Sequence, residues 1–130
     1  MSKSYKKLKL AIIGLGYVGL PLTLEFAKKK EVIGFDINEH RVKALKTGID
    51  KNREFIKEEI QESTSLIFTS KLEDLKLSNC YIVTVPTPVD ELNKPDLSAL
   101  KNASKMVGSI LKREDIVIYE STVYPGCVEE

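Results

Sequence analysis

The sequence lacks tryptophan and is poor in the residues that build metal centres and disulfide frameworks: it has one histidine and two cysteines in 130 residues. Cys80 and Cys127 lie far apart and match no spacing typical of a metal site or of paired disulfides. His40 is predicted to be a solvated surface residue. We therefore expect no metal site, and a cytoplasmic location is the default for such cysteine usage.

Long hydrophobic runs and an excess of one charge are also absent. The apolar run at residues 10–14 is too short and too interrupted by glycine for a signal peptide or a membrane span. Twenty Lys and Arg against nineteen Asp and Glu give a formal net charge of +1, which leaves no basic excess for nucleic acid. The length suits one globular domain, residues 1–130.

Short apolar runs alternate with stretches of helical spacing. Runs rich in Val, Ile and Tyr predict strands, buried on both faces, at residues 8–13, 32–35, 81–85 and 116–119. Leu66-Ile67-Phe68 predicts a further short strand at residues 65–69. Apolar residues three or four apart predict helices at about 16–27, 38–46 and 96–112, with a partly helical segment at 50–63 and a helical turn at 71–75. This alternation indicates the α/β class: a Rossmann-type, doubly wound, mainly parallel sheet with helices on both faces.

Three glycines follow the first predicted strand as Gly14-x-Gly16-x-x-Gly19, with Tyr17 and Val18 between the last two. The first permits a tight turn, the second lets the backbone approach a pyrophosphate, and the third lets the helix pack on the strand. Free N–H groups at the start of that helix, and the positive end of its dipole, attract phosphate. Glycines at this spacing also occur in plain turns, so their place between strand and helix is what favours a dinucleotide.

Asp36 ends the second predicted strand, seventeen residues after Gly19, close to the spacing of the dinucleotide fingerprint. Its carboxylate is expected to accept hydrogen bonds from the adenosine ribose and to repel a 2′-phosphate, so NAD is preferred over NADP. Asp36 also fits a plain capping role for the helix that starts near Asn38. Arg41, five residues on, either flanks the ribose or is a solvated helix charge.

Two further segments, Val85-Pro-Thr-Pro88 and Glu120-Ser-Thr-Val-Tyr-Pro-Gly126, complete a set of four blocks. With them the whole chain resembles the UDP-glucose/GDP-mannose dehydrogenase family. The second segment is most similar to the branch that oxidises UDP-N-acetylhexosamines for bacterial surface polysaccharides such as capsule and Vi antigen. The departures are Tyr124 and Cys127, where many members carry proline and threonine.

The resemblance implies roles for particular residues. Thr87 is expected to lie against the cofactor, and Arg41 to assist Asp36 at the adenosine end. Ser121 is expected to contact NAD, as is Thr122, whose hydroxyl lies near the nicotinamide and a catalytic water and supports proton handling. A capping or turn role for these two hydroxyl residues is the alternative.

The chemistry that the resemblance implies is a four-electron oxidation of a sugar C6 alcohol to a carboxylate through a cysteine-bound aldehyde. The nucleophilic cysteine and catalytic lysine of the family match no position up to 130, so Cys80 is expected to be a core residue and Cys127 is a weak candidate. A missing C-terminal domain is expected to complete the UDP-sugar site, in a full-length homodimer, and the fragment alone to be inactive. A β-hydroxyacid or 6-phosphogluconate dehydrogenase domain and a non-catalytic NAD-sensing module are the alternatives.

Overall fold

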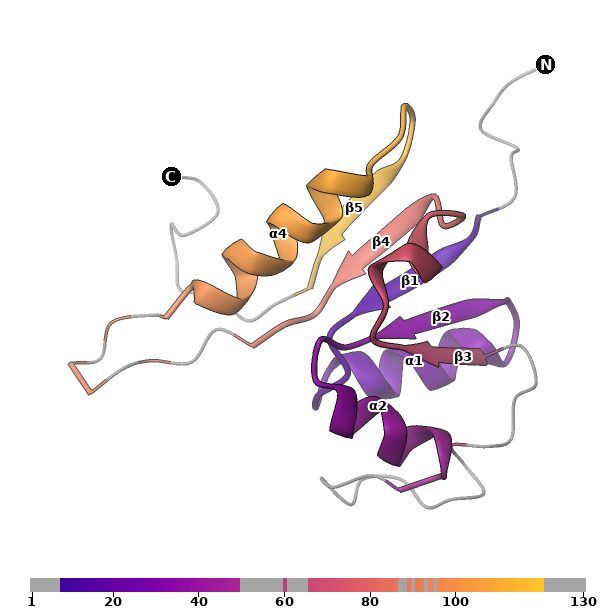
Figure 1. Cartoon of the computed structure of the whole chain (residues 1–130), viewed down its shortest axis with the longest axis horizontal. Helices are drawn as coiled ribbons and strands as arrows, with labels where there is room; N and C mark the ends of the chain where they lie inside the picture. The colour runs from indigo at the N-terminus through magenta and orange to yellow at the C-terminus, as the bar shows by residue number, and fades with distance from the viewer. Residues whose placement is uncertain are drawn as a thin grey trace.

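A computed structural model describes residues 8–49, 60, 66–86, 89, 91–92, 94 and 96–120. Within these residues one parallel sheet has the strand order β3-β2-β1-β4-β5 (Figure 1). The strands are β1 (Leu10–Ile13), β2 (Val32–Phe35), β3 (Leu66–Thr69), β4 (Cys80–Val83) and β5 (Ile116–Tyr119). The helical elements are α1 (Gly19–Ala27), α2 (Glu39–Lys46), the 3-10 turn η2 (Leu72–Leu75) and α4 (Ser98–Ile110). This strand order confirms the Rossmann-type fold.

The sheet separates two apolar layers because successive side chains of a strand point to opposite faces. On one face, Ala11 and Ile13 of β1 pack with Val107 of α4 and Leu75 of η2. On the other face, Leu10 and Ile12 pack with residues of α1, while α2 joins α1 in a neighbouring cluster. Strand β1 pairs with β2 and β4 and is buried along its whole length, so the core is centred on it.

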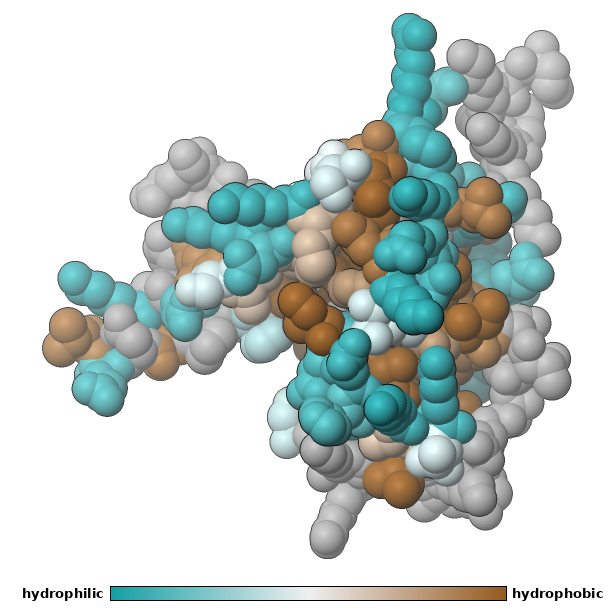
Figure 2. Space-filling view, viewed as in Figure 1, coloured by the Kyte–Doolittle hydropathy of each residue, from teal (hydrophilic) through white to brown (hydrophobic). Residues whose placement is uncertain are grey.

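Strand β5 differs from the prediction of strands covered on both faces. Ile116, Ile118 and Tyr119 are each at least 39% exposed, because β5 forms an edge of the sheet within the described residues. Helix α4 lies beside β5 in Figure 1, and its outer side is mainly hydrophilic in Figure 2. Its buried residues, Ala103 and Val107, lie on one side of the helix. The apolar pattern of β5 thus indicates a strand without indicating how far it is covered.

Some element boundaries shift from those predicted. Helix α1 begins at Gly19 instead of near Gly16, although the Gly16 carbonyl already accepts a hydrogen bond from the Leu20 N–H. Strand β4 covers residues 80–83 and α4 ends at Ile110. Of the partly helical segment predicted at 50–63, only residue 60 lies within the described part of the chain, and it is helical.

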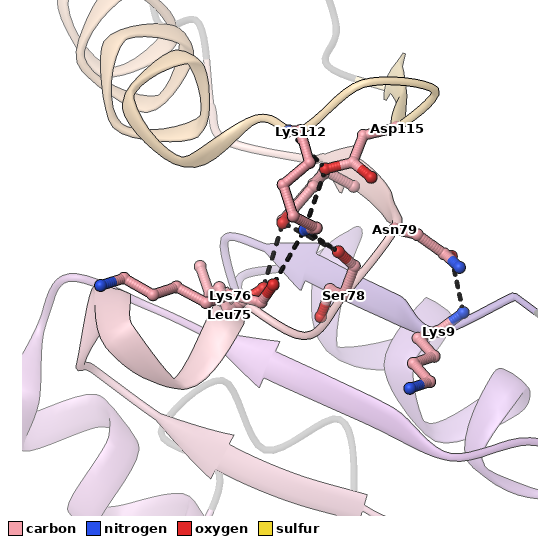
Figure 3. A network of polar contacts seen from close by, with 8 residues as sticks. Lys9, Leu75, Lys76, Ser78, Asn79, Lys112 and Asp115 are labelled. Carbon is pink, nitrogen blue, oxygen red and sulfur yellow. Dashed lines mark hydrogen bonds and ion pairs between the residues drawn. The ribbon is translucent and has the colours of Figure 1, made fainter.

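The amino-terminal edge of the sheet is held by a network around Lys112, which follows α4 (Figure 3). The Lys112 ammonium donates to the carbonyl oxygens of Lys76 (2.8 Å) and Ser78 (2.9 Å). It also pairs with the Asp115 carboxylate at 3.1 Å. These contacts join the segment between α4 and β5 to the segment that leads into β4. The opposite edge, where the strands end, is left for the loops of the site.

Candidate functional site

The glycine loop turns sharply at the end of β1. Gly14 has a φ of +105°, a conformation that residues with a side chain rarely adopt, and its N–H donates to the Phe35 carbonyl at the end of β2 (2.8 Å). A Cβ on Gly19 would stand 1.6 Å from the Gly14 carbonyl oxygen. A Cβ on Gly16 would meet no atom within 4 Å. The predicted turn at Gly14 and close packing at Gly19 are therefore confirmed, and Gly16 faces open space.

Thr84, directly after β4, fixes the same turn from the other side. Its hydroxyl donates to the carbonyls of Gly14 (2.7 Å) and Ile13 (3.1 Å), and its side chain is buried against Gly19. Sequence reasoning missed this residue. The available signal was a hydroxyl inside the apolar run 81–85, at the end of the strand that neighbours β1.

Leu15 is held at both of its backbone groups by side chains from the β2–α2 segment. Its N–H donates to Oδ2 of Asp36 (2.9 Å), and its carbonyl accepts from Nε (2.9 Å) and Nη2 (2.6 Å) of Arg41. The other oxygen of Asp36 accepts from the Asn38 N–H (2.9 Å). Asn38 in turn caps α2. Asp36 thus supports the start of α2, as the alternative capping role predicted. It also fixes the Leu15 N–H in the glycine loop.

Arg41 is only 8% exposed, so the prediction of a solvated helix charge is wrong. The physical reason is that the first turn of α2 lies against the glycine loop, where the guanidinium meets the Leu15 carbonyl. His40, its neighbour, is exposed, as predicted. Successive residues on a helix point about 100° apart, so a buried residue can directly follow an exposed one.

The loop leaves backbone donors free at the start of α1. Among the described residues, the N–H groups of Gly16, Tyr17, Val18 and Gly19 have no hydrogen-bond acceptor. Successive free N–H groups at a helix start form an anion-binding site, strengthened by the helix dipole. The arrangement needs no basic side chain to hold a phosphate.

A cleft of about 460 Å³ lies beside this loop, at the carboxyl ends of β1, β2 and β4. That is the size of a small-molecule site. Of the predicted site residues, Gly14, Gly16, Asp36 and Arg41 line it, whereas Tyr17, Val18 and Gly19 are not among its lining residues. Val85 and Pro86, from the block Val85-Pro-Thr-Pro88, also line the cleft. The remaining lining residues were not predicted for the site: Ile13, Leu15, Phe35, Ile37, Asn38, Ala99, Asn102, Ala103 and Met106.

The predicted residues Thr87, Ser121, Thr122 and Cys127 lie outside the described part of the chain. Cys80 lies in β4 with 3% exposure, and burial raises the pKa of its thiol, which confirms its prediction as a core residue. Over residues 8–49, 66–86 and 96–120 and the isolated described positions, no three metal-ligating side chains gather. The helices in the same part of the chain are too short or too polar to cross a membrane.

The comparison that decides the family is a match over residues 8–130 to the model described as UDP-glucose/GDP-mannose dehydrogenase family, NAD binding domain. The chain belongs to this dehydrogenase family. The family resemblance predicted from the sequence is confirmed, and NAD is the cofactor of this domain. Membership disfavours the β-hydroxyacid alternative.

Relatives within the UDP-glucose/GDP-mannose dehydrogenase family include the UDP-N-acetyl-D-glucosamine 6-dehydrogenase of Salmonella typhi, 56% identical over 95% of this chain and 29% of its own length. Protein CapL of Staphylococcus aureus is 50% identical over 93% of this chain and 28% of its own. A UDP-D-ManNAc dehydrogenase structure from Pyrococcus horikoshii superposes with a TM-score of 0.81 at 36% identity, covering 94% of this chain and 30% of that one. The chain thus spans less than a third of these relatives.

Proposed function

We propose that this chain is the NAD-binding part of a nucleotide-sugar 6-dehydrogenase that oxidises the C6 alcohol of a UDP-sugar to a carboxylate. The names of two 56%-identical relatives, both UDP-N-acetyl-D-glucosamine 6-dehydrogenases, support a UDP-N-acetylhexosamine as substrate. UDP-glucose is the second candidate substrate. The observation that carries the cofactor assignment is the junction of the glycine loop with Asp36 at the cleft.

The cleft and loop fit the parts of NAD in turn. The free N–H groups of the loop, from Gly16 through Tyr17 and Val18 to Gly19, suit the pyrophosphate. A carboxylate offers about four lone-pair positions, so Asp36 keeps capacity for the ribose hydroxyls after accepting two backbone N–H groups. NAD, when bound, supplies the hydride acceptor for the oxidation.

The adenine subsite is proposed at the apolar part of the cleft. Ile37, which is 69% exposed, and Val85 and Met106 are among its lining residues. An exposed large apolar side chain beside Asp36 is explained if a flat, apolar ring covers it. Gly14 contributes the turn on which the loop depends.

The chemistry at the nicotinamide end is assigned, as part of the proposal, to segments after β4 and β5. Thr87 is placed against the cofactor, Ser121 beside it, and Thr122 as an auxiliary catalytic residue. Support comes from Glu120, directly before this pair, whose N–H donates to the Val83 carbonyl at the carboxyl end of β4 (2.8 Å). Parallel strands end at the edge where ligands bind in such sheets.

Further parts of the proposal concern the whole enzyme. A C-terminal domain is expected to share the UDP-sugar with this one, in a homodimer located in the cytoplasm and serving surface polysaccharide synthesis. These stay predictions. Reading the coding sequence beyond Glu130 tests the C-terminal domain and the oxidation, since a Gly-x-Gly-Gly-x-Cys-like segment supports the enzyme, whereas a stop codon there leaves an NAD-binding module and refutes the oxidation.

Isothermal titration of the chain with NAD and with NADP tests the cofactor site. We expect NAD to bind with a dissociation constant in the micromolar to millimolar range, and the Asp36→Ala variant to lose this binding. The matched control is Glu39→Ala, which removes an exposed acid from the first turn of α2 without touching the cleft. A folded chain that shows no binding at millimolar NAD contradicts the proposal.

A further inference from the structure

Arg41 buries a charged guanidinium beside the cleft, although its helix starts at the surface. Burying a cation is costly unless its donors are satisfied, and this one directs two nitrogens to one backbone carbonyl, that of Leu15. Leu15 lies 26 residues earlier, in the glycine loop. The contact therefore links α2 to the segment that precedes α1.

The Leu15 carbonyl that Arg41 binds lies shortly before the start of α1. In an uninterrupted helix this oxygen would accept the N–H of Gly19, four residues on. Two guanidinium donors take its place, and α1 begins at Gly19 with the Gly19 N–H free of any acceptor in the described part of the chain. Asp36 fixes the N–H of the same leucine, so the peptide groups on both sides of Leu15 are held.

We propose that Arg41 is a positioning residue for the pyrophosphate of the cofactor. Its guanidinium acts through the Leu15 carbonyl, holding the loop so that the N–H groups from Gly16 to Gly19 stay free and converge on the phosphates. This inference rests on the proposed NAD site. It differs from a direct role at the adenosine end, which the family resemblance suggested for Arg41.

The two roles predict different responses to pieces of the cofactor. Adenosine carries the base and ribose without phosphate, whereas ADP adds the diphosphate that the loop is proposed to bind. A residue that acts through the loop affects ADP and NAD together and leaves adenosine unchanged. A residue that contacts the adenosine end affects all three ligands alike.

The experiment measures adenosine, ADP and NAD binding to the wild-type chain and to Arg41→Met and Arg41→Lys. We expect Arg41→Met to weaken ADP and NAD by roughly 10- to 100-fold, the range for losing hydrogen bonds that involve a charged group. Arg41→Lys should restore part of this loss, because an ammonium can reach a carbonyl but lacks the two-pronged geometry. The control is Lys43→Met, which removes an exposed cation from the same helix.

A measurement on the unmodified chain covers the case in which both variants fail to fold. Because Arg41 Nε donates to Leu15 before any ligand arrives, its proton should give an NMR signal that exchanges slowly with water in the free protein. Fast exchange that slows only on adding ADP overturns the inference. Equal losses for adenosine and NAD in the variants overturn it too, while leaving the NAD site standing. If the wild-type chain binds neither ADP nor NAD, both the role of Arg41 and the proposed NAD site are refuted.

Discussion

Gly19 packs so closely on Gly14 that a Cβ on the later residue would stand 1.6 Å from the carbonyl oxygen of the earlier one. The obstacle is backbone and is itself fixed by Thr84. We therefore predict that Gly19→Ala lowers the free energy of unfolding by about 3 kcal/mol or more, the upper range for overpacking. Urea unfolding followed by circular dichroism measures this. Wild-type stability in the variant would contradict the close packing.

Gly16 differs from Gly19 in that a side chain at this position would have space. Its Cβ would meet no protein atom within 4 Å, and Gly16 itself lines the cleft. We predict that Gly16→Ala unfolds at a urea concentration close to that of the wild-type chain but binds NAD at least tenfold more weakly, because a methyl group occupies space proposed for the phosphate. Unchanged NAD affinity by calorimetry would show that the ligand does not approach there.

Thr84 should link stability to cofactor affinity. Replacing it by valine keeps the shape of the side chain but leaves the Gly14 carbonyl without its hydroxyl donor. We expect Thr84→Val to lose about 1–3 kcal/mol of stability and some NAD affinity, since a buried acceptor becomes unsatisfied. Thr47→Val is the control: its exposed hydroxyl donates to the Ala44 carbonyl (2.8 Å), where water can replace it, so the variant should lose less stability and keep the wild-type NAD affinity. Equal behaviour of the two variants would refute the role of Thr84.

Alkaline pH should destabilise the fold through two buried acids. Burial raises the pKa of the Cys80 thiol, and burial raises the pKa of the Tyr81 hydroxyl, which donates to the carbonyls of Leu75 and Ser78. The folded state then keeps protons that the unfolded chain releases. The stability they contribute is full below the unfolded pKa and is lost as pH rises through the folded pKa.

The free energy of unfolding should therefore fall above about pH 8.5 and more steeply above about pH 10, the ordinary values of the two groups. Urea unfolding across this range measures the slope. Tyr81→Phe should flatten the upper part, whereas Tyr119→Phe, at a 49% exposed tyrosine, should keep the wild-type slope. If the two variants show identical slopes, Tyr81 does not cause the loss of stability at alkaline pH.

Lys112 should contribute to the stability of the fold and not to NAD binding in the cleft. Its side chain is 50% exposed, and its ammonium bonds to two carbonyls and to the buried carboxylate of Asp115. We predict that Lys112→Met loses about 1 kcal/mol, the scale for bonds partly screened by water. NAD affinity should stay constant, because the network lies at the amino-terminal edge of the sheet. Lys105→Met, on the exposed side of α4, serves as the control.

Much of this fold was predictable because its signals are local. The strand-helix alternation gave the parallel sheet, and the spacing of Gly14, Gly16 and Gly19 indicated the turn, the open face and the close packing. Asp36 was found from its distance along the chain. Each of these features depends on residues within one βαβ unit, where spacing in sequence determines spacing in the structure.

The remaining parts of the site come from segments far apart in the chain. Thr84 reaches Gly14 across 70 residues, and a threonine at a strand end carries no mark of its partner. Met106 and Ala99 line the cleft because one side of α4 borders it, which the apolar pattern of a helix cannot indicate. Arg41 shows the same limit, because an arginine in the first turn of a helix is usually solvated.

The hydrogen bond between Thr84, directly after β4, and Gly14, directly after β1, makes the shape of the loop depend on the pairing of these two strands, which form only in the folded chain. Cofactor binding and folding of the chain are therefore thermodynamically linked. At a concentration one hundred times its dissociation constant, a ligand bound by the native state alone adds about 2.7 kcal/mol to the free energy of unfolding. The melting temperature of the chain should therefore rise with the concentration of bound cofactor and can be used to measure its binding.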